Sequence, residues 1–124
     1  MIQAFQRRVA VWVESVFGLD SLLHRKNRAL RVVEEAVELA QAEGCDELSM
    51  YKIVQRVYSR PVGSPPREGA AVFLTLLAWA EASRTDLPQV LRDELDHLEE
   101  IPAEHFRQRQ REKHQAGTDL VTPR

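Results

Sequence analysis

The sequence has little cysteine and no long apolar run, and these absences exclude several classes of protein. A single cysteine, Cys45, excludes an intrachain disulfide framework and a cysteine-rich zinc site. The longest apolar stretch, 69–80, is interrupted by Thr75 and is too short to span a bilayer. The amino-terminal residues lack the basic start, apolar run and cleavage site of a secretory signal. We therefore expect a cytoplasmic protein with no membrane partner.

An excess of charge of one sign is also absent. The 17 Lys and Arg residues nearly balance the 19 Asp and Glu residues, so we expect no nucleic-acid polymer as a partner. A hydrophobic share of 44% and a charged share of 29% are typical of a folded globular chain. At 124 residues, such a chain can form a core without disulfides or a structural metal. We predict one domain over residues 1–116 and a flexible tail over residues 117–124.

The periodicity of apolar residues predicts an all-α fold. Alternation of β-branched residues is scarce, and glycine and proline lie between segments of helical period. We predict a bundle of about five helices, at 2–17, about 21–42, 47–58, 67–82 and 87–100. Pro102 ends the last of these, and the polar, basic segment 103–115 follows.

The helix predicted at 67–82 is apolar on nearly all sides, so water cannot be its environment. It must be buried in the middle of a bundle or at a subunit interface. Because so small a chain has few elements to cover it, we predict a homo-oligomer that completes a four-helix core.

Acidic residues cluster on the second predicted helix. Glu34, Glu35 and Glu38 share an arc of about 100° on the helix wheel, beside an apolar face. Glu68 opens a later helix, next to a loop rich in proline and glycine. Carboxylate oxygens are the ligands that Mg²⁺ and Mn²⁺ prefer, and a divalent cation would relieve the repulsion between such acids.

The same acids also have a simpler explanation. Arg31 lies three and four residues before Glu34 and Glu35, the spacing of an ordinary ion pair on a helix surface. Glu68 lies in the first turn of its helix, where the helix dipole favours a negative charge. Taken alone, the pattern is more typical of a solvated helix face than of a metal site.

Two runs of sequence resemble a known family. Residues 28–44, which contain Glu-Glu-x-x-Glu, resemble the core helix of the MazG-like all-α nucleoside triphosphate pyrophosphohydrolases. Residues 57–76, with Arg-Pro-Val-Gly-Ser-Pro-Pro-Arg-Glu-Gly, are similar to a phage and bacterial subgroup, as is the basic end, 107–113. The resemblance implies dimers, or dimers of dimers, that use Mg²⁺ to cleave a triphosphate into a monophosphate and pyrophosphate.

The resemblance also implies roles for individual residues. Glu35 and Glu38 would be metal ligands, and Glu68 would be the first acid of a second metal-binding motif. Glu34 would be a further ligand or would orient the attacking water, and it is our first choice for the group that takes the proton. Basic side chains should neutralise the departing pyrophosphate; the candidates are Lys26, Arg28, Arg60, Arg109 and Lys113.

The chain departs from the family pattern at Ala71, where the family has a second acid. The site can hold fewer metal ions with more water, or the chain can have kept the fold and lost catalysis. A different acid can also replace the missing one; the candidates are Asp86, Asp93, Glu94 and Asp96.

Three functions follow as hypotheses. The first is a Mg²⁺-dependent pyrophosphohydrolase that acts on ribo- or deoxyribonucleoside triphosphates. The second is a non-catalytic protein of the same fold that binds a nucleotide or a metal or serves in assembly, and Ala71 is its motivation. The third is a small helical interaction module whose acids form only a solvated face.

Overall fold

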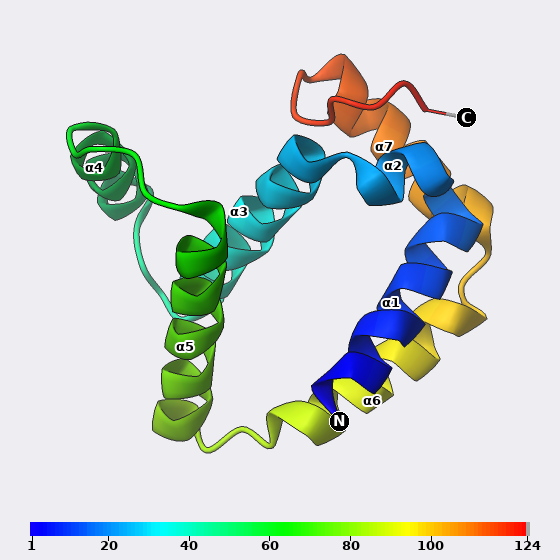
Figure 1. Cartoon of the computed structure of the whole chain (residues 1–124), viewed down its shortest axis with the longest axis horizontal. Helices are drawn as coiled ribbons and strands as arrows, with labels where there is room; N and C mark the ends of the chain where they lie inside the picture. Colours follow the sequence, from blue (N-terminus) through cyan, green and yellow to red (C-terminus); the bar gives the residue numbers. More distant parts are fainter. Residues whose placement is uncertain (124) are drawn as a thin grey trace.

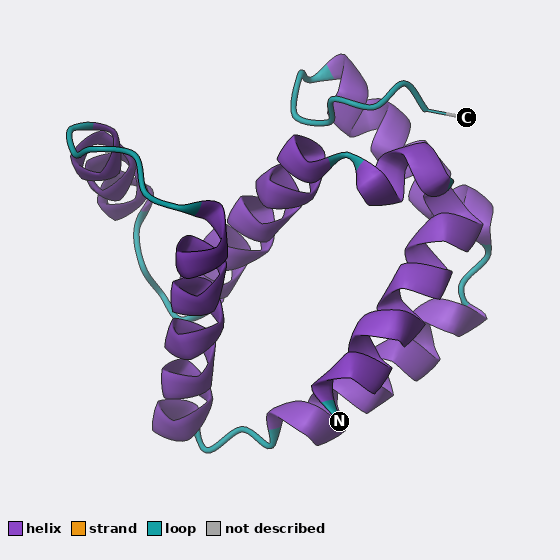
Figure 2. Cartoon of the chain, viewed as in Figure 1, coloured by secondary structure: helices purple, strands orange, loops and turns teal. Residues whose placement is uncertain are grey.

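The computed structural model describes residues 1–123, and its regular secondary structure is entirely helical (Figure 2), which confirms the all-α class. Seven helices follow one another in this part of the chain: α1 (Ile2–Phe17), α2 (Leu19–Leu23), α3 (Arg25–Ala42), α4 (Glu47–Tyr58), α5 (Pro65–Ser83), α6 (Leu87–Glu100) and α7 (Ala103–Gln115). Within these residues no helix has both the length and the apolar character needed to cross a membrane.

The number of helices exceeds the predicted five for two reasons. The basic segment 103–115 is helical, and the second predicted helix is divided at His24. The backbone of His24 is extended, and its ring Nδ1 accepts a hydrogen bond of 3.1 Å from the Asn27 amide. A side-chain acceptor at this position satisfies an amide that the first turn of a helix leaves unpaired. His24 is thus the N-cap of α3, which begins as a separate helix.

Aspartates begin two other helices. The Ser49 amide donates to Asp46 Oδ1 at 2.9 Å at the start of α4, and the Gln89 amide donates to Asp86 Oδ1 at 3.2 Å at the start of α6. Both are N-caps. Asp86 therefore has a structural role, which removes it from the acids that can replace the one missing at position 71.

Helices α1 and α6 run side by side, and α7 crosses their end (Figure 1). Arg8 on α1 forms ion pairs with Asp96 at 2.7 Å and with Glu99 at 2.8 Å on α6. At the other end of α1, the Trp12 and Phe106 rings meet edge to face with centroids 5.0 Å apart. These contacts join the start of the chain to its last two helices.

The core of the single chain is small. Its buried apolar side chains are Val13, Val16, Ala80, Leu95 and Phe106. Helix α4 has no buried residue, and α5, predicted to be buried because it is so apolar, buries only Ala80. Figure 1 shows α4 standing apart from the helices around α1. Large apolar side chains on α5 are thus in water in one chain: Val72, Phe73, Leu74 and Leu77.

The segment predicted as a flexible tail, 117–124, turns back to the start of α3 as far as residue 123, and Arg124 lies outside the described residues. Gly117, with a φ of 78°, makes the turn after α7. The Leu120 amide donates to Asn27 Oδ1 at 2.9 Å, and Asp119 is only 5% exposed. The sequence does not indicate these contacts because they are polar and have no helical or strand period.

We expect Phe106→Ala to lower the free energy of unfolding by about 3 kcal/mol, since Phe106 is buried against Trp12 and truncation leaves a cavity. Urea denaturation at several protein concentrations measures this. Val62→Ala is the control, because Val62 is fully exposed in a loop and its truncation should cost under about 0.5 kcal/mol. Equal losses in both variants would contradict the core described above.

Candidate functional site

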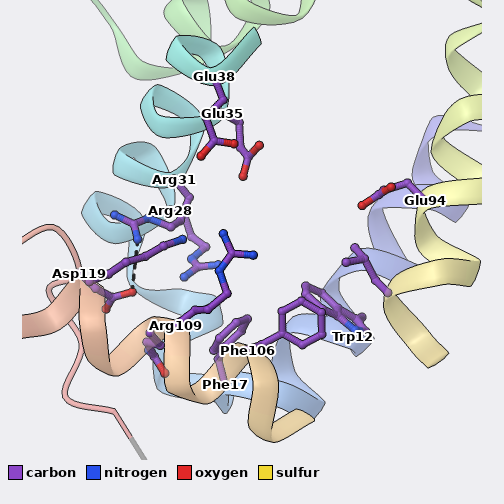
Figure 3. A pocket seen from close by; sticks show the side chains of 13 residues that line it. Trp12, Phe17, Arg28, Arg31, Glu35, Glu38, Glu94, Phe106, Arg109 and Asp119 are labelled. Atoms are coloured by element: carbon purple, nitrogen blue, oxygen red, sulfur yellow. Dashed lines mark ion pairs between the residues drawn. The ribbon is translucent and has the colours of Figure 1, made fainter. Parts of the chain in front are cut away.

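A pocket of about 500 Å³ lies between α1, α3, α6, α7 and the segment after α7 (Figure 3). Acidic, basic and aromatic side chains form three separate parts of its wall. The lining residues are Trp12, Phe17, Arg28, Arg31, Glu35, Glu38, Glu94, Leu98, Phe106, Arg109, Gln110, Lys113 and Asp119. Five of the predicted site residues are therefore brought together here: Arg28, Glu35, Glu38, Arg109 and Lys113.

The acidic part of the wall belongs mainly to α3. Glu35 and Glu38 point into the pocket one turn apart, and Glu94 on α6 faces them from the opposite side (Figure 3). Partial burial raises the pKa of Glu35 above its ordinary value, and the neighbouring charges of Glu38 and Glu34 add to this rise. The Glu35 carboxylate is thus held in a position that a nearby cation would stabilise.

The basic part of the wall comes from two helices. Arg28 and Arg31 extend from α3, and Arg109 and Lys113 extend from α7. Burial lowers the pKa of Arg28, an effect that the nearby charge of Asp119 opposes. Four cationic side chains around one pocket are a strong attraction for a phosphate-bearing ligand.

Glu34, predicted as the catalytic base, does not line the pocket. Its Oε1 lies 2.6 Å from Lys113 Nζ, and its Oε2 lies 3.5 Å from Arg31 Nη1. The expected ion pair between Arg31 and Glu34 is therefore present. In this geometry Glu34 holds two basic residues of the wall, and its role as a base stays a prediction.

Three other predicted residues lie away from the pocket wall: Lys26, Arg60 and Glu68. The Glu68 side chain folds over Gly63 in the loop before α5. Within residues 1–123, no three His, Cys, Asp or Glu side chains are grouped as a metal site would require. In a single chain, the acids of the two predicted motifs do not meet.

Aromatic rings form the third part of the wall. Trp12 lies edge to face with Phe106 and, at a centroid distance of 5.9 Å, with Phe17. A flat apolar surface beside cationic groups can receive a nucleobase while the cations bind its phosphates.

Among the charged side chains of this site, the sequence did not indicate two. Arg31 was explained only as an ion-pair partner, although its position one turn before Glu35 places it on the same helix face. Asp119 comes from the segment expected to be flexible, and no local pattern marks it. By contrast, Glu94 was among the acids proposed to replace the missing one, and it faces the pocket.

Comparison with known proteins finds no matching family model, no matching curated protein and no matching solved structure. The likeness to MazG-like enzymes therefore rests on the sequence alone, in residues 28–44, 57–76 and 107–113. What the pocket does has to be argued from its own residues.

We expect Glu35→Gln to stabilise the metal-free protein by a few tenths of a kcal/mol at neutral pH, since it removes like-charge repulsion on α3. A carboxyl group with a raised pKa in the folded state gives stability at low pH that is lost as the pH rises from 4.5 through the raised value. The advantage of the variant should therefore shrink as the pH falls toward 4.5.

Denaturation at a series of pH values measures this difference. Glu100→Gln, at an exposed position outside the pocket, is the control. An advantage of Glu35→Gln that grows in acid would contradict the raised pKa.

Proposed function

We propose that this protein is a nucleoside triphosphate pyrophosphohydrolase, which converts a (d)NTP and water into a (d)NMP and pyrophosphate. The observation that carries the proposal is one pocket with acids on one side, four cationic side chains on another and aromatic rings on a third. These are the groups that a metal–triphosphate and its base require. The resemblance of residues 28–44 and 57–76 to MazG-like enzymes points in the same direction.

The acids present fit Mg²⁺, or Mn²⁺ in its place. Mg²⁺ keeps several waters and commonly binds through one or two carboxylates together with substrate phosphates, so it does not need a cage made by the protein alone. Glu35 and Glu38 would hold it, and a bound cation would offset the burial and the neighbouring glutamate charges that raise the pKa of Glu35. When bound, the ion would neutralise charge that develops on the phosphate oxygens.

The basic residues have a separate task. Water attacks the α-phosphorus, and the bond from that atom to the oxygen bridging to the β-phosphorus breaks. Arg109 can offer a planar fork of donors to phosphate oxygens, Arg28 and Arg31 add positive charge from the wall, and Lys113 adds a compact charge. Together they stabilise the departing pyrophosphate. Lys26 and Arg60 lie outside the pocket of a single chain, and their part in this step stays a prediction.

We also propose that two or more copies of the chain associate. Apolar side chains on α4 and α5 are too numerous to stay in water, as exposures of 66% for Leu74 and 56% for Ile53 illustrate. Glu68 lies at the start of α5, so covering this helix with a second copy is also what would bring Glu68 to a metal site. The partners are thus a nucleoside triphosphate and a second copy of the chain.

A non-catalytic binding protein is the second candidate. Ala71 in place of an acid and the scattered acids of the single chain favour it. Such a protein would bind a nucleotide in the same pocket and release no product.

We expect the wild-type protein to release pyrophosphate from at least one triphosphate in a panel of ribo- and deoxyribonucleotides with Mg²⁺ or Mn²⁺. Glu38→Gln should lower the rate roughly 100-fold or more, as does loss of a group that stabilises transition-state charge. Glu100→Gln is the matched control and should keep the wild-type rate. A folded wild-type protein that releases nothing, but melts at a higher temperature with a nucleotide, would establish the binding protein instead.

Light scattering should give a mass of two or four chains at micromolar concentration. Leu74→Asp should lower this mass, because a carboxylate in a buried apolar contact is costly. Val62→Asp adds the same charge in a loop where the side chain is fully exposed, and should leave the mass unchanged. A wild-type monomer would refute the association.

A further inference from the structure

The segment after α7 is attached to α3 by a set of polar contacts around Asp119. The Asn27 side chain, itself fully buried, donates from Nδ2 to Asp119 Oδ1 at 3.3 Å. The Val121 amide donates to the same oxygen at 3.0 Å. His114 Nδ1 lies 3.0 Å from the Asp119 carbonyl oxygen. The Asp119 carboxylate is thus fixed from several directions.

The other oxygen of this carboxylate faces the basic part of the pocket. Asp119 Oδ2 lies 3.6 Å from Arg31 Nη1, as the dashed line in Figure 3 marks. On the same guanidinium group, Nη2 donates to the Thr118 carbonyl oxygen. Arg31 is therefore held by two neighbouring residues of the C-terminal segment, and its side chain is only 18% exposed.

The charge of Asp119 also acts on the pKa of Arg28. Arg28 lies one turn before Arg31, and the positive charge of each disfavours that of the other. Its Nη2 donates to Ser21 Oγ at 3.1 Å, while its buried Nε has no hydrogen-bond partner within residues 1–123. The buried negative charge of Asp119 pairs with Arg31 and opposes the lowering of the Arg28 pKa.

We propose that Asp119 is a positioning residue, which holds Arg31 in the pocket wall so that its positive charge faces the phosphates of a bound nucleotide. This inference rests on the proposed function, and it makes the C-terminal segment part of the nucleotide site. A guanidinium group that is held in place before binding loses less conformational freedom when a phosphate binds beside it, which strengthens binding.

Titration calorimetry with inorganic pyrophosphate and Mg²⁺ tests this on the full chain. Asp119→Asn keeps the shape and the acceptor oxygen but removes the charge that faces Arg31. We expect its dissociation constant for pyrophosphate to rise about tenfold, or about 1.4 kcal/mol. In the hydrolysis assay, KM should rise by a similar factor while kcat changes less. Asp20→Asn, an exposed position on α2 outside the pocket, should match the wild type.

Unchanged pyrophosphate affinity and KM in folded Asp119→Asn would overturn the proposal. Arg31→Lys is the second variant if Asp119→Asn does not fold, since it keeps a positive charge beside Asp119 and loses the planar fork. We expect the same loss of pyrophosphate affinity, and wild-type affinity in Arg31→Lys would equally overturn the proposal.

The two proposals fail in different ways. Wild-type protein that binds pyrophosphate in an Asp119-dependent manner, yet hydrolyses no triphosphate, supports the positioning role and refutes the hydrolase. Wild-type protein that hydrolyses triphosphate, while Asp119→Asn has the same KM and pyrophosphate affinity, supports the hydrolase and refutes the positioning role. Wild-type protein that binds no pyrophosphate and hydrolyses nothing refutes both.

Discussion

The site depends on how opposite charges on α3 are balanced by the far end of the chain. Within a few turns, α3 carries Arg28 and Arg31 and then three glutamates. Lys113 on α7 pairs with Glu34, and Asp119 pairs with Arg31. Because these partners leave Glu35 and Glu38 facing the pocket without an ion pair among residues 1–123, the acidic part of the wall stays open to a metal. The attachment of α7 and its following segment to α3 therefore determines which charges the pocket presents.

A second constraint is the shortage of buried apolar surface. The contacts among α1, α6 and α7 form one small core, whereas α4 and most of α5 have none within a single chain. A helix as apolar as α5 is stable only where its side chains leave water. Association of chains would satisfy this requirement. It would also place Glu68, in the first turn of α5, beside a second copy of the chain. Assembly and completion of the site are, in our proposal, the same event.

The secondary structure was largely predictable, because it depends on local signals. Apolar period, proline at the start of α5 and aspartate caps on α4 and α6 all act within one turn of a helix. The break at His24 was not predicted, since an imidazole cap gives no regular signal. The polar contacts of residues 117–123 were missed for a similar reason: they join residues about 90 positions apart, such as Asn27 and Leu120, separated by 93.

By itself, the sequence determined the all-α class and the placement of Glu35 and Glu38 on one helix face, since both follow from a 3.6-residue period. Only the tertiary structure decided that Arg31 and Asp119 join the pocket, that Glu34 is engaged by Lys113, and that the Glu68 side chain lies against Gly63 in the loop before α5. A helix wheel fixes directions around one axis. Which face of one helix contacts which face of another depends on packing and on buried charge, and those are properties of the whole chain.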